Sequence, residues 1–480
     1  MGSTGSQIEN QRPDLPSLKE RGTMGEAVIL IFDVGKTNKK VLLFDEQYRL
    51  VFEESKKFEE ITDEDGFPCE DVSALADWVK NSFDPLTQHK DFQIKAVNFS
   101  AYGASFVYLD KDLNVIAPLY NYLKPYKPDL QKKFYKDYGG ESLVSKQTAS
   151  PVLGNLNSGM QLYRLKYEKP DLFKDIKYAL HLPQYLSYVL TSKLYTDITS
   201  IGCHTNLWNF QDEKYHQWVN KEGIAEKFPP ILSYERVADK INGHIAAGGG
   251  LHDSSSALIP YLISFQEPFV LLSTGTWCIT LNPFNNTMLS DYELDEDCLC
   301  YLSYQGKPVK ASRLFAGYEH EQQVKRLAEF FKKSVDHYSS VECDPLILGE
   351  LKKRKPVKAR SNDNRLSDFQ FRKLEEFSSY EEAYHQLIAD IMRQQVRSTN
   401  LVLKGVQVKR IFVDGGFSRN PIYMYLLAEA FPKIEVYAAS VPQASALGAA
   451  LAIHQHWNEK QLPSDIIDLK LYSVTHGAKV

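Results

Sequence analysis

Two short loops, about half a chain apart, place glycine among residues that can bind phosphate. The first follows Asp33 and contains Gly35, Lys36, Thr37, Asn38 and Lys40. The second, residues 273–277, contains Thr274, Gly275 and Thr276. Glycine lets backbone N–H groups approach phosphate oxygens, while hydroxyl, amide and ammonium groups add hydrogen bonds and charge. Facing each other, two such loops could hold a nucleoside triphosphate, although each alone is more common as an ordinary hairpin.

A third loop and an acidic residue extend this chemistry. Residues 414–421 put Gly415 and Gly416 where a strand turns into a helix. A flat ring could lie against this bare backbone, with its edge bonded by Ser418 and Asn420; the alternative is a plain tight turn. Asp33 ends an apolar run and could hold Mg²⁺ through water, since this ion usually keeps several waters.

The elements around the first loop are predicted from hydrophobic periodicity. Residues 27–45 and 268–284 each indicate strand, turn, strand, and residues 48–55 indicate a third strand. A helix is predicted over residues 71–83, with one apolar face formed by Val72, Leu75, Ala76 and Val79. Residues 94–110 predict a strand, a Tyr-Gly turn and a second strand, the kind of junction where open α/β folds place ligands.

The rest of the chain continues this alternation. Residues 121–210 are predicted to be mostly helical, and the glycine-rich residues 241–260 indicate a domain boundary near 260. A helix is predicted over residues 378–403, where Ser379 and Glu382 have capping-box spacing and the apolar stripe indicates core packing. It leads to a strand at 409–416, a further helix, and a helix of small residues within 441–455.

Composition narrows the classes of function. The chain has 480 residues, 43% hydrophobic and 24% charged, which indicates a globular protein of two or three domains. A net charge of −5 gives no electrostatic reason to expect nucleic acid or an anionic membrane as the main partner. The basic run at 352–360 favours a solvated loop over a nucleic-acid patch or import signal.

Cysteine usage and the N-terminal residues indicate where in the cell the protein is expected. The six cysteines show no metal-ligand spacing, which favours a reduced, cytoplasmic protein. No stretch approaches the roughly 18 apolar residues of a membrane span. Residues 1–23 are polar and lack the apolar centre of a secretory signal, so they are either a native leader or an addition upstream of a natural start at Met24.

In order and spacing, four segments resemble the motifs of the FGGY carbohydrate kinases, within the actin, Hsp70 and sugar-kinase ATPase superfamily. They are the Asp33 loop with Lys40, GLHDSSSAL at 250–258, STGTW at 273–277 and VDGGFSRNP at 413–421. The resemblance runs from about Val28 to Gln455. It implies an α/β fold of two ribonuclease H-like domains, each with a mixed central sheet, and a ligand cleft between them. The expected domains are a sugar-binding domain over 24–260, an ATP-binding domain over 261–457 and a C-terminal extension over 458–480.

The resemblance also implies roles for residues. Asp253 matches the family's catalytic base, which accepts the proton of a sugar hydroxyl as its oxygen attacks the γ-phosphorus of ATP. The alternative for Asp253 is capping of the following helix. Thr274, Gly275 and Thr276 match phosphate contacts, and Mg²⁺ is expected near Asp33 and Asp253. Lys36 departs from the family's usual small residue, and contact with phosphate and exposure to solvent are equally favoured.

Sugar recognition is implied for a second group of residues. Tyr102, Gly103 and Ser105 align with the family's substrate loop, and His204 and His252 are further candidates, although a buried core role is favoured for His204 alone. Ser105, Leu123 and Gln184 depart from residues that are usually acidic in members of the family, which indicates an altered pocket.

The expected activity is ATP-dependent phosphorylation of a ketose. The candidates are a 6-deoxyketohexose such as L-rhamnulose or L-fuculose, or a ketopentose such as D-xylulose. ATP and a small-molecule sugar are the expected partners, and a homodimer is compatible with this. The alternatives are a nucleotide switch of the actin or Hsp70 type, and a degenerate kinase that acts as a sugar sensor.

Overall fold

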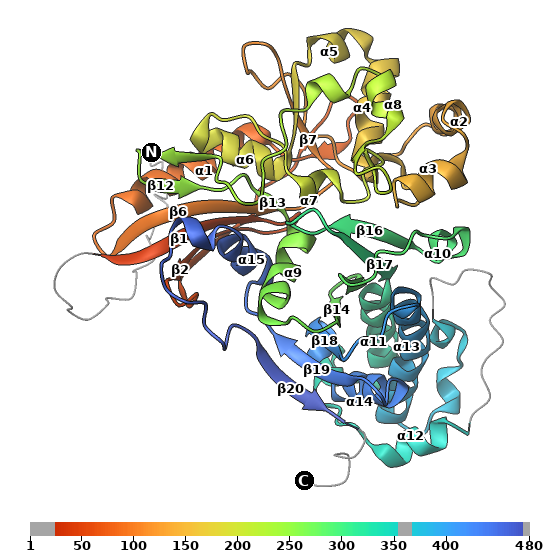
Figure 1. Cartoon of the computed structure of the whole chain (residues 1–480). Helices are drawn as coiled ribbons and strands as arrows, with labels where there is room; N and C mark the ends of the chain where they lie inside the picture. Colours follow the sequence, from red (N-terminus) through yellow and green to blue (C-terminus); the bar gives the residue numbers. More distant parts are fainter. Residues whose placement is uncertain (1–24, 354–366, 474–480) are drawn as a thin grey trace, which may run out of the picture.

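The computed structural model describes residues 25–353 and 367–473, and within them the chain forms two halves, each built on a seven-stranded mixed sheet (Figure 1). This confirms the predicted α/β class with two sheets. The predicted leader at 1–23 and most of the basic run at 352–360 lie outside the described residues.

The first sheet contains the hairpin predicted around Asp33. β1 (Glu26–Val34) pairs antiparallel with β2 (Lys39–Asp45) and parallel with β6 (Phe92–Ala101). Side chains of a strand alternate between the faces of its sheet, so β1 contributes to two cores, with Val28 on one face and Ile29 on the other. The remaining strands are β3 (Leu50–Lys56), which pairs with β2, β12 (Ile245–Ala247) and β13 (Leu251–His252), which pair with β6, and β11 (Asp239–Ile241), which pairs with β12.

The outer face of this sheet is covered by α1 (Val72–Thr87) and α6 (Leu182–Thr191). The apolar face predicted for α1 is buried, and Asp71 caps the helix by accepting a hydrogen bond from the Ala74 N–H at 3.0 Å. Smaller strand pairs flank it, β4 (Ile61–Thr62) with β5 (Pro68–Cys69) and β7 (Phe106–Leu109) with β8 (Tyr178–His181).

A mostly helical region, as predicted for 121–210, extends the first half. Its core is aromatic, with Phe134 packed edge-on against Trp218 at 5.1 Å between ring centroids. Its elements are α2 (Pro128–Asp137), α3 (Glu141–Gln147), α4 (Ser158–Glu168), α5 (Pro170–Asp175), α7 (Ile198–Ile201), β9 (Trp208–Asn209), β10 (Lys214–Tyr215) and α8 (Gln217–Lys221).

The second sheet repeats the plan with the hairpin predicted at 268–284. β14 (Phe269–Thr274) pairs antiparallel with β15 (Cys278–Asn282) and parallel with β18 (Arg410–Gly415). The other strands are β16 (Cys298–Leu302) and β17 (Pro308–Leu314) on one side, and β19 (Glu435–Ser440) and β20 (Asp468–Tyr472) on the other. β20 lies in the segment expected to be a C-terminal extension, and it forms an edge strand of this sheet.

One face of the second sheet is covered by helices of the second half. The predicted helix over 378–403 is confirmed as α13 (Tyr380–Leu403), whose cap Ser379 accepts a hydrogen bond from the Glu382 N–H at 3.2 Å. Beside it lie α11 (Ala316–Phe331), α12 (Pro345–Leu351) and α14 (Pro421–Ala430), while α10 (Asp291–Asp295) precedes β16.

Two helices connect the sheets. α9 (Asp253–Ser264) packs closely on α15 (Ala444–Ala452), the predicted helix of small residues. A Cβ added at Gly448 of α15 would lie 1.8 Å from the Ser256 carbonyl oxygen, so only glycine permits this approach. α15 was expected within the second domain, but it packs against β1 and β6 of the first sheet (Figure 1). The predicted domain limits therefore stay a prediction. One hydrophobic core, which includes α15, is shared between the halves.

Candidate active site

The two candidate carboxylates lie at the ends of β1 and β13, two strands that both pair with β6. Asp33 stands near the end of β1 beside Ser100 of β6, and His252 of β13 stands beside Ala101 of β6, directly before Asp253. The Asp33 Oδ2 accepts a hydrogen bond from the Ser445 hydroxyl at 2.9 Å. Parallel strands thus bring together two residues that are 220 positions apart in the chain.

Both carboxyl groups have raised pKa values. Burial raises the pKa of Asp33 to about 6, with a smaller contribution from the negative charge of Asp253. Burial also raises the pKa of Asp253 to about 6. A carboxyl whose pKa lies near neutrality is suited to accept a proton during a reaction, and two such groups side by side form a candidate active site.

Asp253 is not the cap of the helix that follows it. The cap residue of α9 is His252, and Asp253 is the first residue within the helix. Its Oδ1 accepts hydrogen bonds from the N–H of Ser254 at 2.6 Å and from the Ser254 hydroxyl at 3.3 Å. The capping alternative is therefore wrong, and the carboxylate is held at the start of the helix by the next residue.

In the first phosphate loop, Gly35 donates its N–H to the Asn38 carbonyl at 2.9 Å, and Thr37 and Asn38 are exposed. The structure shows neither alternative for Lys36: its ammonium is not free in solvent, and it is not free to contact phosphate. Its ammonium lies 2.7 Å from Glu60 Oε1 and 3.6 Å from Glu70 Oε1. Lys40 pairs with Glu53 at 2.8 Å and donates to the Gln443 side chain at 2.9 Å. A phosphate contact by either lysine stays a prediction, and it would require exchange of these partners.

The second and third loops are bonded to each other. The Thr274 hydroxyl donates to the Asp414 carbonyl at 2.5 Å and accepts from the Phe417 N–H at 3.0 Å. Gly415 has φ +85°, and a Cβ there would lie 1.9 Å from the Thr274 carbonyl oxygen. Gly275 and Thr276 are exposed beyond this junction. The Thr274 side chain therefore stabilises the loop pair. The Gly275 N–H donates to the Trp277 carbonyl at 2.9 Å, which leaves the exposed Thr276 as a candidate phosphate donor.

The double glycine leaves bare backbone, as expected for a ring-binding turn. A Cβ added at Gly416 would meet no atom within 4 Å. The two polar side chains after it are engaged: Ser418 donates to the Gly415 carbonyl at 2.8 Å, and Asn420 caps α14 by accepting from the Ile422 and Tyr423 N–H groups, both at 3.1 Å. Sequence reasoning missed this capping role, and the contact of either side chain with a ring stays a prediction.

On the first half, His252 packs directly against the predicted substrate loop. A Cβ added at Gly103 would lie 2.7 Å from His252 Cδ2. The Nε2 of His252 is 3.3 Å from Asp253 Oδ1 and 3.2 Å from Cys203 Sγ, and its ring stacks on Tyr301 at 5.8 Å. Sequence reasoning missed Cys203 and Tyr301, because nothing local shows that a strand of the second half meets this histidine.

His204 lies near the same group of side chains. Its ring centroid is 6.0 Å from Tyr301 and 6.5 Å from His252, and its Nδ1 has no hydrogen-bond partner within residues 25–353 and 367–473. Burial lowers the pKa of His204 to about 3 and of His252 to about 4, so both imidazoles are neutral at pH 7. The sequence favoured a role in core packing for His204, and core packing does not explain this Nδ1.

The three departures from the family pattern have different surroundings. Ser105 is buried, and so is Tyr102 of the same predicted substrate loop. Burial together with Glu70 raises the pKa of the Tyr102 hydroxyl well above its ordinary value. Gln184 donates to the Gly250 carbonyl at 2.9 Å and so supports the strand before Asp253. Leu123 is 67% exposed.

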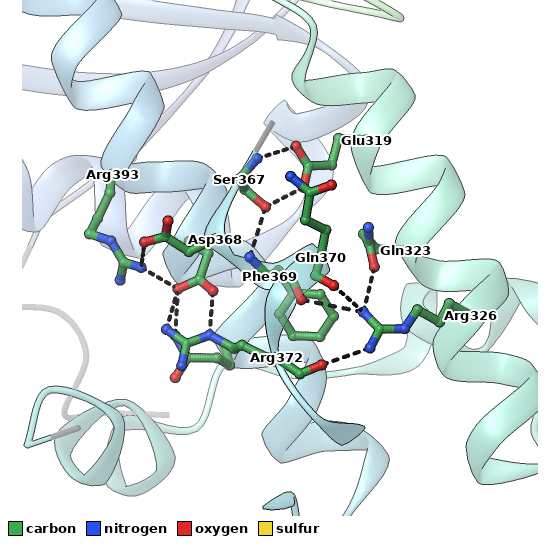
Figure 2. A network of polar contacts seen from close by, with 11 residues as sticks. Glu319, Gln323, Arg326, Ser367, Asp368, Phe369, Gln370, Arg372 and Arg393 are labelled. Carbon is green, nitrogen blue, oxygen red and sulfur yellow. Dashed lines mark hydrogen bonds and ion pairs between the residues drawn. The ribbon is translucent and has the colours of Figure 1, made fainter. Parts of the chain in front are cut away.

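A cleft of about 1110 Å³ lies between the halves and reaches the second phosphate loop at Trp277. Its wall in the second half is held by a polar network that includes Arg372 and Arg393, both labelled in Figure 2. Both arginines donate to Asp390, at 2.5 and 2.6 Å. In the same network Arg326 donates to the Arg372 carbonyl at 2.7 Å, and Glu319 accepts from the Ser367 N–H at 2.6 Å. These bonds fix the segment from Ser367 onward against α11 and α13.

Two negative findings apply to the described residues alone. Residues 25–353 and 367–473 contain no cluster of three or more His, Cys, Asp or Glu side chains arranged to hold a metal ion. None of their helices has the length and apolar character needed to cross a membrane.

Comparison with known families decides the class of protein. Residues 28–257 match the N-terminal domain of the FGGY family of carbohydrate kinases, and residues 266–461 match the FGGY carbohydrate kinase C-terminal domain. The chain belongs to the FGGY family of carbohydrate kinases. The predicted resemblance is thus confirmed, and the protein is an ATP:sugar phosphotransferase by family.

FGGY relatives match over nearly the whole chain. A probable L-xylulose kinase of Haemophilus influenzae is 24% identical over 475 residues, covering 92% of this chain and 93% of that protein. A rhamnulokinase of Halalkalibacterium halodurans is 22% identical over 488 residues, covering 92% and 98%. The crystal structure of a carbohydrate kinase from Novosphingobium aromaticivorans superposes with a TM-score of 0.75 at 22% identity, covering 94% of this chain and 95% of that one, which shows the shared fold.

Proposed function

We propose that this FGGY kinase transfers the γ-phosphate of ATP to a hydroxyl of a neutral ketose, either a 6-deoxyketohexose or a ketopentose. The observation that carries the proposal is the pair Asp33 and Asp253, which lie at the ends of two strands that both pair with β6 and which both have a pKa raised to about 6. Relatives named L-xylulose kinase, rhamnulokinase and L-fuculokinase support a ketose as acceptor.

In the proposed reaction Asp253 acts as the base. Its ionised carboxylate accepts the proton of the sugar hydroxyl while the sugar oxygen forms a bond to the γ-phosphorus and the bond to the ADP oxygen breaks. Because the transition state is loose, positioning and neutralisation of charge supply most of the catalysis. Exposed Thr276 would bind phosphate oxygens, and Gly275 would do so by exchanging its bond to the Trp277 carbonyl. The bare backbone at Gly416 would support the adenine ring.

A magnesium ion fits the donor set of this site. Asp33 and Asp253 would hold it, directly or through water, because Mg²⁺ prefers oxygen ligands and usually binds proteins through one or two carboxylates. When bound, the ion would neutralise charge on the β- and γ-phosphate oxygens. Burial raises the pKa of Asp33, and the negative charge of Asp253 adds to this; a divalent cation bound there would favour the ionised carboxylates.

The deciding experiment is a coupled ADP-release assay over a panel of ketoses, with the position of the product phosphate determined by NMR. We expect sugar-dependent ADP release from the wild type, and a loss of at least about 10³-fold in kcat for Asp253→Asn, with ATP binding retained. Sugar binding without ADP release would support the sensor alternative. Near-normal turnover by Asp253→Asn would show that Asp253 is not the base.

A further inference from the structure

Arg313 of β17 projects from the face of the second sheet that meets the first half. Alternate residues of a strand share a face, so Arg313 shares its face with Val309 and Ala311, which pack in the core between the halves. On the neighbouring strand β16, Tyr301 is on the same face and stacks on His252, the residue before Asp253. Arg313 therefore stands on the same side of the sheet as the candidate base.

The Arg313 side chain is held in place by one terminal N–H, while its Nε–H has no hydrogen-bond partner within the described residues. One terminal N–H donates to Asp297 Oδ1 at 2.6 Å, and the guanidinium lies 5.2 Å from the centroid of the Trp277 ring. The side chain is only 9% exposed. Its Nε is buried and has no hydrogen-bond partner within the described part of the chain. A buried guanidinium N–H without a partner is unfavourable, so a bound molecule that accepts this bond would be favoured.

Arg313 and Trp277 both line the cleft, and so do Leu153 and Leu156 of the first half. The charge of Arg313 also acts on the side chains beside the base: burial raises the pKa of Cys203 well above its usual range, the Asp253 charge adds to this, and Arg313 opposes it. Arg313 thus lines a cleft that both halves form and that reaches the second phosphate loop at Trp277.

The charge of the cleft indicates what can bind there. Its described lining includes seven Asp or Glu residues and the three arginines Arg313, Arg393 and Arg397. All three arginines are paired with carboxylates of the cleft. The lining therefore carries an excess of negative charge, which disfavours an anionic acceptor such as an aldonate and leaves a neutral polyhydroxy ketone compatible.

We propose that Arg313 is a substrate-recognition residue that donates a hydrogen bond to a hydroxyl or carbonyl oxygen of the ketose, and that its pairing with Asp297 selects neutral sugars over sugar acids. This proposal rests on the kinase activity proposed above. The acceptor oxygen takes the place of the missing partner of Nε, and Trp277 and Asp297 fix the orientation of the guanidinium before the sugar arrives.

The first test is Arg313→Met, measured with the ketose that the wild type uses best. We expect KM for the ketose to rise about 10- to 100-fold, as for loss of a hydrogen bond from a charged group. KM for ATP should stay within about twofold. The matched control is Arg410→Met, because Arg410 lies on another strand of the same sheet, pairs with Glu435 at 3.0 Å, stands 5.9 Å from the Phe265 ring and lies outside the cleft lining. The control should keep both KM values.

A second variant tests the charge argument. Asp297→Asn leaves Arg313 positive without its counter-ion, so we expect kcat/KM for an aldonate relative to the ketose to rise about tenfold. An unchanged ratio would overturn the proposed selection of neutral sugars. An unchanged ketose KM in Arg313→Met would overturn the recognition role. If that variant does not fold, as judged by circular dichroism, Arg313→Lys decides in its place, because lysine lacks the planar fork and should raise the ketose KM about fivefold or more.

Assays of the wild-type enzyme distinguish the proposed kinase function from the proposed recognition role of Arg313. Absence of ATP-dependent phosphorylation on every sugar tested would contradict the proposed function itself. Phosphorylation of a ketose by the wild type together with an unaffected Arg313→Met variant would contradict the recognition role alone.

Discussion

At the scale of single residues, burial determines the chemistry of this site. Asp33 and Asp253 stand at strand ends that are covered by α9 and α15, and removal from water disfavours their charged forms. The same cause keeps His204 and His252 neutral at pH 7. The site therefore contains two carboxyl groups that titrate near neutrality beside two imidazoles that do not.

The raised pKa of Asp253 predicts how activity depends on pH. The base must be ionised, so kcat/KM should fall as pH decreases through about 6, approaching tenfold per pH unit. A pH–rate profile from pH 4.5 to 8 checks this. A profile that stays flat to pH 5 would show that the group responsible is not Asp253.

The same shift predicts a change in stability. The folded-state pKa of about 6 exceeds the ordinary value of 3.8, so the folded chain binds this proton more tightly and loses stability as pH rises from about 4 to 6. Asp253→Asn should thus raise Tm relative to the wild type at pH 7.5, and the difference should vanish near pH 3.8. Thermal unfolding at the two pH values measures it.

At the scale of elements, the contact between α9 and α15 positions the base. Asp253 is the first residue of α9, and α15 supplies Ser445, whose hydroxyl bonds Asp33. The helices approach closely because Gly448 presents no side chain to the Ser256 carbonyl. One helix pair therefore fixes the positions of both carboxylates.

Gly448→Ala should disturb this pair. The added methyl group would overlap the Ser256 carbonyl oxygen, which predicts a loss of roughly 1–3 kcal/mol in unfolding free energy, together with lower kcat. Chemical denaturation and the kinase assay measure the two effects.

The matched control for this substitution is Gly349→Ala in α12. A Cβ there meets no atom within 4 Å, and alanine favours helix over glycine by up to about 1 kcal/mol. The control should be neutral or more stable. Equal effects of the two substitutions would contradict the close-packing explanation.

At the scale of the whole molecule, each half has a core of its own, and a further core joins the two halves. One hydrophobic cluster joins Ile29 and Leu258 of the first half with Leu271 and Tyr301 of the second, and with the α15 residues Leu447 and Leu451. Lys146 and Asp291 also form an ion pair between the halves at 2.8 Å. The relative position of sugar loop and phosphate loops is thus determined by packing between the halves.

A truncated chain tests this sharing. Residues 25–264 alone lack α15, so apolar groups of β1, β6 and α9 are exposed, and we expect this fragment to be largely insoluble when expressed. The control is a chain that ends at residue 467, which lacks only the mostly exposed strand β20 among the described elements and should stay soluble. Recovery of a soluble, cooperatively unfolding 25–264 fragment would contradict the shared core.

Features that depend on neighbouring residues could be predicted from the amino-acid sequence. Strand-turn-strand patterns gave the hairpins around Asp33 and Thr274, helical periodicity gave α1 and α13, and motif order gave the family, because backbone conformation and the period of burial act over a few residues. Which distant residues contact each other is known from the folded structure alone. Tyr301 stacked on His252 and α15 packed on the first sheet are contacts that form only when the two halves pack together. Glu60 and Glu70 reach Lys36 only when the first half folds, and no local pattern encodes contacts between such distant segments.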